Sequence, residues 1–179
     1  MKNSSFNIDI REENANDFPA VYNVHFTAFG RNDEARLTDR LRLSKAFIPQ
    51  LSLVAQTDNK IVGHILFTKI TISNDVDGGA TESLSLAPVA VVPEMQRQGI
   101  GAMLIRRGLE IARELGYKSV IVLGHKDYYP RFGFISTQKW QIKPPFNVPK
   151  ETFMGLELID GSLSDVAGVV KYADEFLAI

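Results

Sequence analysis

The chain has no cysteine among its 179 residues. That absence excludes disulfides, thiolate metal sites and a cysteine nucleophile. The 20 basic and 21 acidic residues nearly cancel to a net charge of −1, so no overall field draws the protein to nucleic acid or to an anionic membrane. Uncharged runs such as 46–57 are far shorter than the ~20 residues that span a bilayer. The start, 1–6, carries no apolar signal segment, and we therefore expect a cytoplasmic protein without nucleic-acid or membrane partners.

What the chain does contain is the composition of an ordinary folded domain. Hydrophobic residues make up 45% and charged residues 23% of the sequence, both close to globular averages. A chain of 179 residues corresponds to one domain. A chain of this length buries about two thirds of its extended-chain surface on folding, so it needs no disulfide to be stable. We expect a single domain across 1–179.

The spacing of apolar residues predicts an alternation of strands and helices. Two expected strands are joined by a short turn at Asp58 and Asn59, residue types that favour a hairpin. A helix after residue 99 has one apolar stripe and ends at Gly116, and a short apolar strand follows it. The order predicts an α+β fold with a mixed, mostly antiparallel sheet and one central β-α-β crossover. The expected strands are 7–11, 51–56, 61–72, 83–92, 119–123 and 153–158. The expected helices are 14–29, 33–43 and 99–115, with a helical turn at 127–132. The chain from 134 onward is expected to be strand-rich, and 164–179 is left open between strand and helix.

The most informative stretch, 89–102, reads Val-Ala-Val-Val-Pro-Glu-Met-Gln-Arg-Gln-Gly-Ile-Gly-Ala. A strand ends at a proline, and a turn with Gly99 and Gly101 runs straight into the helix. Glycines two residues apart let backbone N–H groups approach an anion without a Cβ in the way, and the helix N-terminus adds free donors and the positive end of its dipole. With the charge of Arg97, this pattern favours a pyrophosphate site, although the same glycines also suit an ordinary turn.

The sequence does not match the residue spacing of other nucleotide-binding, catalytic or metal-binding motifs. A dinucleotide-binding fold needs G-x-G-x-x-G after its first strand, and here Leu104 stands in the place of the third glycine. The G-x-x-x-x-G-K-[ST] phosphate loop and the G-x-S-x-G serine elbow are both missing from the sequence. His25, His64 and His125 each lack a second ligand close by in sequence, so we expect no metal site.

Residues 96–101, Gln-Arg-Gln-Gly-Ile-Gly, together with Leu-Ala-Pro-Val-Ala-Val-Val-Pro at 86–93, resemble motif A of the GNAT acetyltransferases. In that family this loop holds the pyrophosphate of acetyl-CoA, and the preceding strand splays from its neighbour to pair with the pantetheine arm. The resemblance implies acetyl-CoA as co-substrate and no metal. It assigns the pantetheine contacts to Val89, Ala90 and Val91, and the pyrophosphate loop to Arg97, Gln98, Gly99, Ile100, Gly101 and Ala102.

The second half of the chain supports the same resemblance. Residues 128–134, Tyr-Tyr-Pro-Arg-Phe-Gly-Phe, resemble the family's Y-x-x-[LF]-G-F signature. The combined pattern L-x-P-V-A-V and Y-Y-x-R-F-G-F is similar to the YhbS-like acetyltransferases, as are 153–158 and 169–172. The resemblance implies a splayed sheet flanked by helices, with an acetyl-CoA-binding core at about 84–134 and acceptor-side elements at about 14–47 and 135–179. It also implies acetyl transfer to a primary amine by direct attack in a ternary complex.

The resemblance gives one residue a catalytic role. Tyr129 matches the family tyrosine that stands beside the coenzyme sulfur as general acid, and a backbone N–H near Val91 would stabilise the oxyanion. A phenol with a pKa of ~10 is able to donate to a leaving thiolate. Two alternatives stay open: Tyr128 is one residue away, and either tyrosine also suits plain aromatic packing.

The sequence identifies no single general base. The expected strand 119–123 has no carboxylate, His125 lies just past it, and Ser85 is unsuited as a base. Glu34 is a candidate for the acceptor pocket, although a carboxylate in the first turn of a helix is also stabilised by the helix dipole. A proton relayed by water, or an amine that is already neutral, would serve instead.

Several properties are left open by the sequence. The acceptor is a small-molecule amine or a peptide of unidentified structure, and the acyl-chain preference is not readable. A homodimer through the tail strands remains one option for the oligomeric state. Because no base is assigned, an acyl-CoA-binding module without turnover, acting as a sensor or scaffold, is the alternative function.

Overall fold

A nine-stranded mixed sheet organises the described residues, 7–74 and 78–176, of this computed structural model. The strand order is β1-β2-β3-β4-β5-β8-β6, and β9 pairs with β3 and with β7. Neighbouring strands are antiparallel except for the parallel pairs β4–β5 and β7–β9. The strands are β1 (Asp9–Glu12), β2 (Phe47–Thr57), β3 (Lys60–Ser73), β4 (Ala80–Val91), β5 (Ser119–Leu123), β6 (Ile135–Ser136), β7 (Ile142–Lys143), β8 (Phe153–Glu157) and β9 (Gly168–Lys171).

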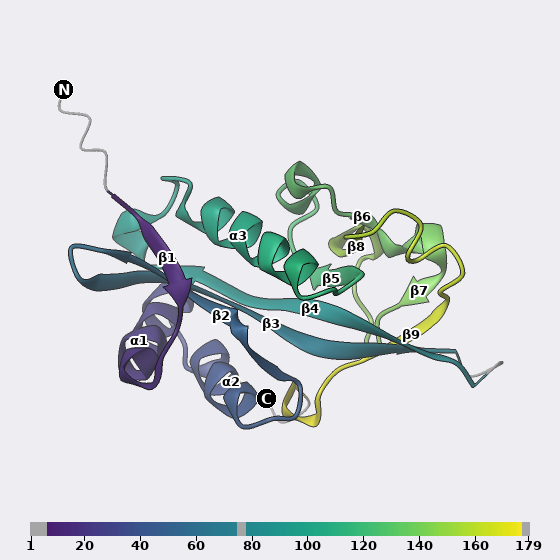
Figure 1. Cartoon of the computed structure of the whole chain (residues 1–179), viewed down its shortest axis with the longest axis horizontal. Helices are drawn as coiled ribbons and strands as arrows, with labels where there is room; N and C mark the ends of the chain where they lie inside the picture. Colours follow the sequence, from purple (N-terminus) through teal and green to yellow (C-terminus); the bar gives the residue numbers. More distant parts are fainter. Residues whose placement is uncertain (1–6, 75–77, 177–179) are drawn as a thin grey trace.

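Three α-helices cover the described sheet from its two faces. Helix α3 (Ile100–Glu114) lies on one face, whereas α1 (Phe18–Phe29) and α2 (Asp33–Arg42) lie on the other (Figure 1). Helix α3 connects β4 to its parallel neighbour β5, which confirms the expected central crossover. Short 3₁₀ turns fill the connections at Ala15–Asp17, Pro93–Met95, Tyr129–Phe132, Thr137–Trp140, Lys150–Thr152 and Asp174–Phe176.

Local sequence explains the sharp boundaries of these elements. Asp58 and Asn59 both adopt positive φ, 47° and 59°, which is the conformation of the tight hairpin turn between β2 and β3. Helix α3 begins after Gly99 in the left-handed region and ends before Gly116, whose φ is also positive. The expected hairpin and the expected helix at 99–115 are therefore confirmed.

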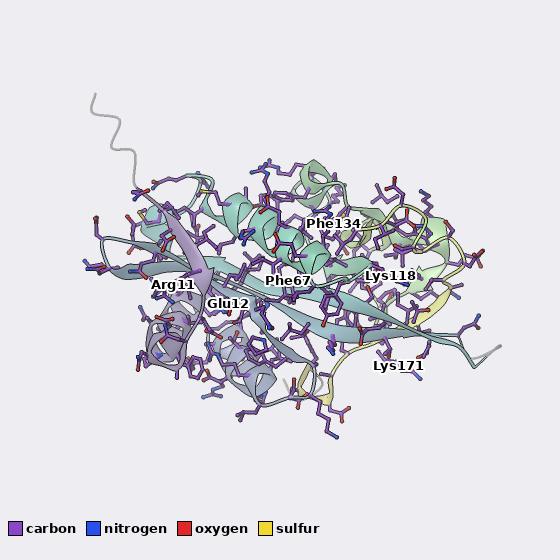
Figure 2. All side chains as sticks on the ribbon, viewed as in Figure 1. Arg11, Glu12, Phe67, Lys118, Phe134 and Lys171 are labelled. Atoms are coloured by element: carbon purple, nitrogen blue, oxygen red, sulfur yellow. The ribbon has the colours of Figure 1, made fainter. Side chains whose placement is uncertain are left out.

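Close packing fixes α3 against the sheet. Gly108 of α3 has no side chain, and a Cβ built there would lie 2.3 Å from Cε2 of Phe67 on β3. Phe67 itself is fully buried and lies between the sheet and α3 (Figure 2). A larger residue at 108 would push the helix away from the sheet, so Gly108 sets the distance between α3 and the strands beneath it.

The sheet opens between β4 and β5. Their pairing covers Leu84↔Val120 and Ser85↔Ile121 and no later residues, although β4 continues to Val91. The other edge of β4 stays paired with β3 through a register shift beside the cis peptide Ala87–Pro88. Beyond Ser85 the two parallel strands therefore diverge, and the backbone edge of β4 that faces β5 is left free for a ligand.

A buried polar network holds α1 and α2 on the opposite face. Arg42 of α2 donates to both carboxylate oxygens of Glu13 at 2.9 Å, and Ser52 donates to the same carboxylate at 2.6 Å. Because the Ser52 proton is used there, Nε2 of His64 donates to Ser52 Oγ at 3.0 Å. Nδ1 of His64 is then an acceptor, and Nε2 of His25 donates to it at 2.8 Å. The network joins α1, α2, β2 and β3.

Two segments differ from their sequence-based predictions, and the structure also describes most of the segment that the sequence left open. Strand β2 starts at Phe47, earlier than expected, and its ladder skips from Phe47↔Thr68 to Ser52↔Leu66. Pro49 lies in the skipped part, where its missing N–H costs no pairing. Residues 134–152 form two-residue strands and 3₁₀ turns, and the described part of the open segment, 164–176, forms β9 and a 3₁₀ turn. Residues 1–6, 75–77 and 177–179, and with them the start of the chain and the end of the segment left open, lie outside the described residues.

Candidate functional site

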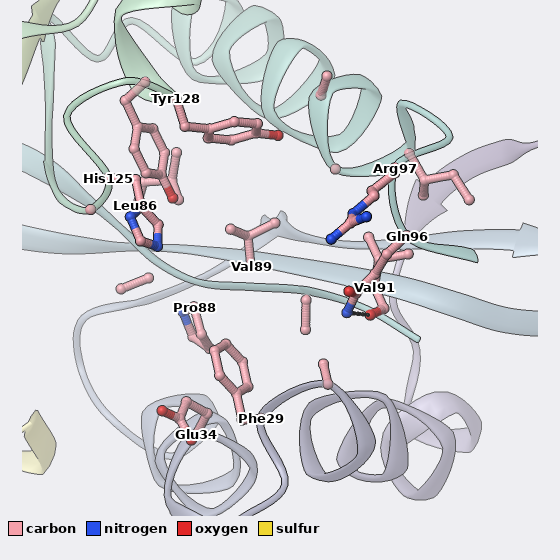
Figure 3. A pocket seen from close by; sticks show the side chains of 18 of the residues that line it. Phe29, Glu34, Leu86, Pro88, Val89, Val91, Gln96, Arg97, His125 and Tyr128 are labelled. Carbon is pink, nitrogen blue, oxygen red and sulfur yellow. Dashed lines mark hydrogen bonds between the residues drawn. The ribbon is translucent and has the colours of Figure 1, made fainter. Parts of the chain in front are cut away.

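A cavity of about 1220 Å³ occupies the opening between β4 and β5. Its walls come from four parts of the chain: residues 86–91 of β4, the loop into α3, the end of β5 with the turn after it, and the α1–α2 corner. The cavity passes around β4, because Arg97 and Tyr128 lie on one side of this strand and Phe29 and Glu34 on the other (Figure 3). The site is thus one continuous space that reaches both faces of the sheet.

The loop into α3 is shaped for an anion. Arg97 and Gly99 have positive φ, 61° and 86°, so the turn brings successive backbone N–H groups to the cavity. The first intrahelical bond runs from Met103 N to Gly99 O at 3.0 Å, which leaves the preceding amides of α3 available to a ligand. A Cβ on Gly101 would lie 3.3 Å from the Tyr128 hydroxyl oxygen, so the absence of a side chain there keeps the helix N-terminus open.

The strand segment predicted to hold the pantetheine arm lines the middle of the cavity. Val89 and Val91 are partly exposed, and Ala90, between them, is buried on the side of His64. Gln96 donates from Nε2 to the carbonyl oxygen of Val91 at 2.9 Å (Figure 3). This bond ties the loop back onto β4 and so fixes the relative position of the strand and the turn before α3.

Two tyrosines form the opposite wall. Tyr129 is 7% exposed and its ring packs against Gly124, where an added Cβ would meet the ring at 2.1 Å. Burial, with a smaller effect of Tyr128, raises the pKa of Tyr129 to about 12. Burial also raises the pKa of Tyr128, against the opposing charges of Arg131 and Arg106. Both phenols are therefore protonated at neutral pH, and each is able to act as a proton donor.

The α1–α2 corner adds an apolar wall with one carboxylate. Ala28, Phe29 and Leu37 line this part, and Phe29 keeps 41% of its surface exposed. The side chain of Glu34 is 15% exposed and accepts two bonds of 3.1 Å and a further short bond from Arg31. Burial is the largest single effect and acts to raise the pKa of Glu34, but the hydrogen bonds from Arg31, a backbone hydrogen bond and the charge of Arg31 together outweigh it and hold the pKa below its ordinary value. Glu34 is thus ionised at neutral pH.

The structure brings nearly all the predicted site residues into this cavity. Of the candidates, Gln98 is not part of the lining, and its side chain donates to the Glu94 carbonyl at 3.2 Å. Ser85 is buried outside the lining, whereas His125 is exposed at the cavity. The residues that the cavity gathers are Val89, Ala90, Val91, Arg97, Gly99, Ile100, Gly101, Ala102, Tyr128, Tyr129 and the acceptor-side candidate Glu34.

Sequence reasoning did not select several cavity residues. Phe29 and Leu37 occupy ordinary positions of amphipathic helices, and nothing in their spacing marks them as ligand contacts. Arg131 stands in the Y-Y-x-R-F-G-F pattern, but that pattern gave it no role. Gln96 had a signal, its fixed place between the end of β4 and the paired glycines, but its bond to Val91 depends on the turn geometry.

Two searches of the described residues gave negative findings. Residues 7–74 and 78–176 contain no group of three or more His, Cys, Asp or Glu side chains that could hold a metal ion. Within the same ranges no helix is long and apolar enough to cross a membrane.

Comparison with known proteins gives consistent matches. The sequence pattern of the acetyltransferase (GNAT) family matches residues 10–134. The uncharacterised N-acetyltransferase YjhQ of Escherichia coli K12 is 41% identical over 136 residues, which are 75% of this chain and 74% of that protein. The uncharacterised N-acetyltransferase YhbS of the same strain is 30% identical over 168 residues, 93% of this chain and 97% of YhbS.

Two crystal structures extend the match to the whole fold. The structure of the Escherichia coli GNAT family N-acetyltransferase YhbS in complex with CoA has a TM-score of 0.88 and 26% identity, and covers 99% of this chain and 96% of that one. A GNAT family acetyltransferase from Brucella melitensis in complex with acetyl-CoA has a TM-score of 0.77 and 31% identity, and covers 96% of this chain and 99% of that one. The fold is thus shared with these proteins over nearly the whole chain, and this chain belongs to the acetyltransferase (GNAT) family.

Proposed function

We propose that this protein transfers an acetyl group from acetyl-CoA to a primary amine by direct attack in a ternary complex. The observation that carries the proposal is the single cavity that joins the anion-binding turn, the free edge of β4, two protonated phenols and the acceptor-side wall. The complexes of YhbS with CoA and of the Brucella melitensis protein with acetyl-CoA support this assignment. The space accommodates a coenzyme and a second substrate together.

The residues of the cavity fit acetyl-CoA. The pyrophosphate would bind at the turn before α3, where Gly99 and Gly101 remove steric bulk and Arg97 adds a positive charge. The pantetheine arm would follow Val89 to Val91, because the β4 edge facing β5 has unpaired backbone groups beyond Ser85. We assign the coenzyme-binding core to about 84–134 and the acceptor side to about 14–47 and 135–179, within one domain.

The proposed reaction needs one proton donor and one oxyanion donor. The neutral amine nitrogen bonds to the thioester carbonyl carbon, the carbon–sulfur bond breaks, and the sulfur leaves with the bonding electrons. Tyr129 donates its phenolic proton to that sulfur, and the proton lost by the amine restores the phenol through solvent. A backbone N–H of β4 near Val91 would stabilise the tetrahedral oxyanion. Because the pKa of Tyr129 is raised to about 12, the phenol stays protonated until the thiolate forms.

Glu34 is our candidate for amine capture at the acceptor side. Among the described residues that line the cavity, it is the only carboxylate, and it is ionised. A protonated amine would be attracted to Glu34 and would lose its proton to water before attack. The apolar surroundings, which include Phe29 and Leu37, favour an amine attached to an apolar body. The tail strands β8 and β9 each pair with two strands of this chain, so a homodimer through them stays a prediction without further support.

Replacing Tyr129 by Phe tests the catalytic role. We expect turnover with a reactive amine to fall roughly 100-fold or more, as for loss of a general acid, while the dissociation constant for acetyl-CoA changes little. Tyr128→Phe is the matched control, because it removes the adjacent hydroxyl from the same wall. Steady-state kinetics and calorimetry measure the two quantities. A loss of affinity without a loss of turnover in Tyr129→Phe, or a larger loss of turnover in Tyr128→Phe, contradicts the assignment.

A further inference from the structure

A second, smaller cavity lies beside α3, next to the first. Its volume is about 270 Å³, and it shares Arg131 with the main cavity. The remaining lining comes from α3 and the 3₁₀ turn after Tyr128, which places the cavity where this turn packs against the helix. The six lining residues are Arg106, Leu109, Glu110, Arg113, Arg131 and Phe132.

The charge of this cavity is positive and uncompensated. In the described part of the chain, Arg106, Arg113 and Arg131 form no ion pair with a carboxylate within 4.0 Å. The carboxylate of Glu110 is engaged by Arg107, at 3.2 Å from Nη1. Three arginines thus line a small space in which the one carboxylate already has a partner.

Aromatic rings hold two of these guanidinium groups in place. The guanidinium of Arg106 lies over the ring of Phe132, with its carbon 5.3 Å from the ring centre. The guanidinium of Arg131 lies over the ring of Tyr128 at 4.8 Å. Cation–π contacts restrict the side chains without using their N–H donors, so both arginines keep their donors for an anion.

The position of these charges relates them to the anion-binding turn. Both Arg106 and Arg131 lower the pKa of Tyr128 by their charge, so their fields reach its hydroxyl. That hydroxyl lies 3.3 Å from where a Cβ of Gly101 would be. Along α3, Arg106 follows Gly101 by five residues, or roughly 7.5 Å of helix. Arg106 and Arg131 therefore stand near the turn that we propose for the pyrophosphate.

We propose that Arg106 and Arg131 bind the 3′-phosphate on the ribose of acetyl-CoA, an inference that rests on the proposed function. The coenzyme carries a phosphate monoester one ribose away from its pyrophosphate, and the planar fork of arginine matches a phosphate in two-bond geometry. The cavity is large enough for a phosphate group. Arg113, farther along α3, adds charge at the outer end.

Coenzyme A and dephospho-coenzyme A, which lacks only the 3′-phosphate, provide the test. Calorimetric titration of the wild-type protein with both compounds should show that coenzyme A binds about tenfold more tightly, since charge-assisted hydrogen bonds to phosphate are lost in the second compound. Raising the salt concentration should shrink this ratio, because the arginines are exposed and salt screens such charges. Equal affinity for the two compounds at low salt would overturn the inference.

Single substitutions locate the effect. Arg106→Gln and Arg131→Gln should each weaken coenzyme A binding several-fold while leaving dephospho-coenzyme A binding nearly unchanged. Arg107→Gln is the control: it removes the same charge from the next position on α3, where the side chain pairs with Glu110 and Glu114 instead of lining the cavity. Equal losses in Arg106→Gln and Arg107→Gln contradict the site. Failure of both compounds to bind the wild type refutes the proposed function itself, so the two failures are distinguishable.

Discussion

Lowering the pH from 8 to 5 should reduce the free energy of unfolding by about 4 kcal/mol, because two histidines are buried in the neutral state. His25 and His64 are both 0% exposed and bonded to each other. Burial, with contributions from His64 and Arg42, lowers the pKa of His25 to about 2. Burial, with a contribution from Arg42, lowers the pKa of His64 to about 3. Protonation of either ring would also break the chain of donors that ends at Glu13.

The sign and size follow from proton linkage. Each histidine binds a proton with a pKa of about 6.5 in the unfolded chain, and in the folded chain only at much lower pH. Stability is therefore complete above pH 6.5 and is lost as the pH falls from there toward the folded-state pKa values. At pH 5 the loss is about 2 kcal/mol for each histidine, or about 4 kcal/mol for the pair, a large part of the 5–15 kcal/mol typical of a domain.

Urea denaturation at several pH values between 5 and 8 measures this effect. The range stops at pH 5 because carboxylates such as Asp17, whose pKa Arg11 lowers, begin to contribute only in more acidic solution. His125→Asn is the matched control, since this histidine is exposed in the folded protein and its loss should leave the pH dependence intact. His64→Asn should reduce it to about half, because His25 still contributes about 2 kcal/mol. A wild-type stability that is constant within about 1 kcal/mol from pH 8 to 5 would refute the reasoning.

Three further substitutions address the main cavity. Gly101→Val should weaken acetyl-CoA binding by tenfold or more, because its Cβ alone approaches the Tyr128 hydroxyl to 3.3 Å at the proposed anion site; unchanged affinity in calorimetry would contradict that site. Gly124→Ala should lower kcat roughly 10- to 100-fold with little change in coenzyme affinity, since the new methyl group displaces the Tyr129 ring, and an unchanged kcat would argue against a role for that ring. Glu34→Gln should raise the KM for the amine and leave the KM for acetyl-CoA unchanged in steady-state kinetics; the opposite pattern would remove Glu34 from the acceptor side.

The part of the cavity that we propose for the coenzyme was predictable from the sequence because its parts are local. Gly99 and Gly101 lie two residues apart at the start of a helix whose apolar stripe is unmistakable, and the strand before them ends at a proline. Such a segment constrains its own backbone, so its residues indicate both the structure and the anion it would bind. The hairpin at Asp58 and Asn59 was predictable for the same reason.

The acceptor side and the buried network depend on long-range packing. His25 and His64 are 39 residues apart, and nothing in the sequence around either histidine indicates that their rings meet. Phe29 and Leu37 line the cavity because α1 and α2 cross the sheet at the point where β4 and β5 diverge. The position at which α1 and α2 cross the sheet depends on how these helices pack on their face of it. The spacing of apolar residues in the sequence does not indicate that position.

Arg106, at the small cavity beside α3, is another residue whose surroundings could not be predicted from the sequence. In sequence, Arg106 and Arg107 are equivalent exposed positions on a helix face that carries both charges. In the structure Arg107 pairs with Glu110 and Glu114, whereas Arg106 lies over Phe132 and faces the cavity. The difference arises from the 3₁₀ turn at Tyr129–Phe132, which packs against one side of α3.

Release of free thiol from acetyl-CoA in the presence of amines tests the central claim most directly. The protein would be incubated with acetyl-CoA and a panel of small amines and peptides, with mass spectrometry to identify the acetylated product. We predict thiol release that depends on both the amine and the Tyr129 hydroxyl, with one acetylated amine formed for each thiol. Tight binding of acetyl-CoA with no thiol release for any amine or peptide would contradict acetyl transfer and would favour a coenzyme-binding module without turnover.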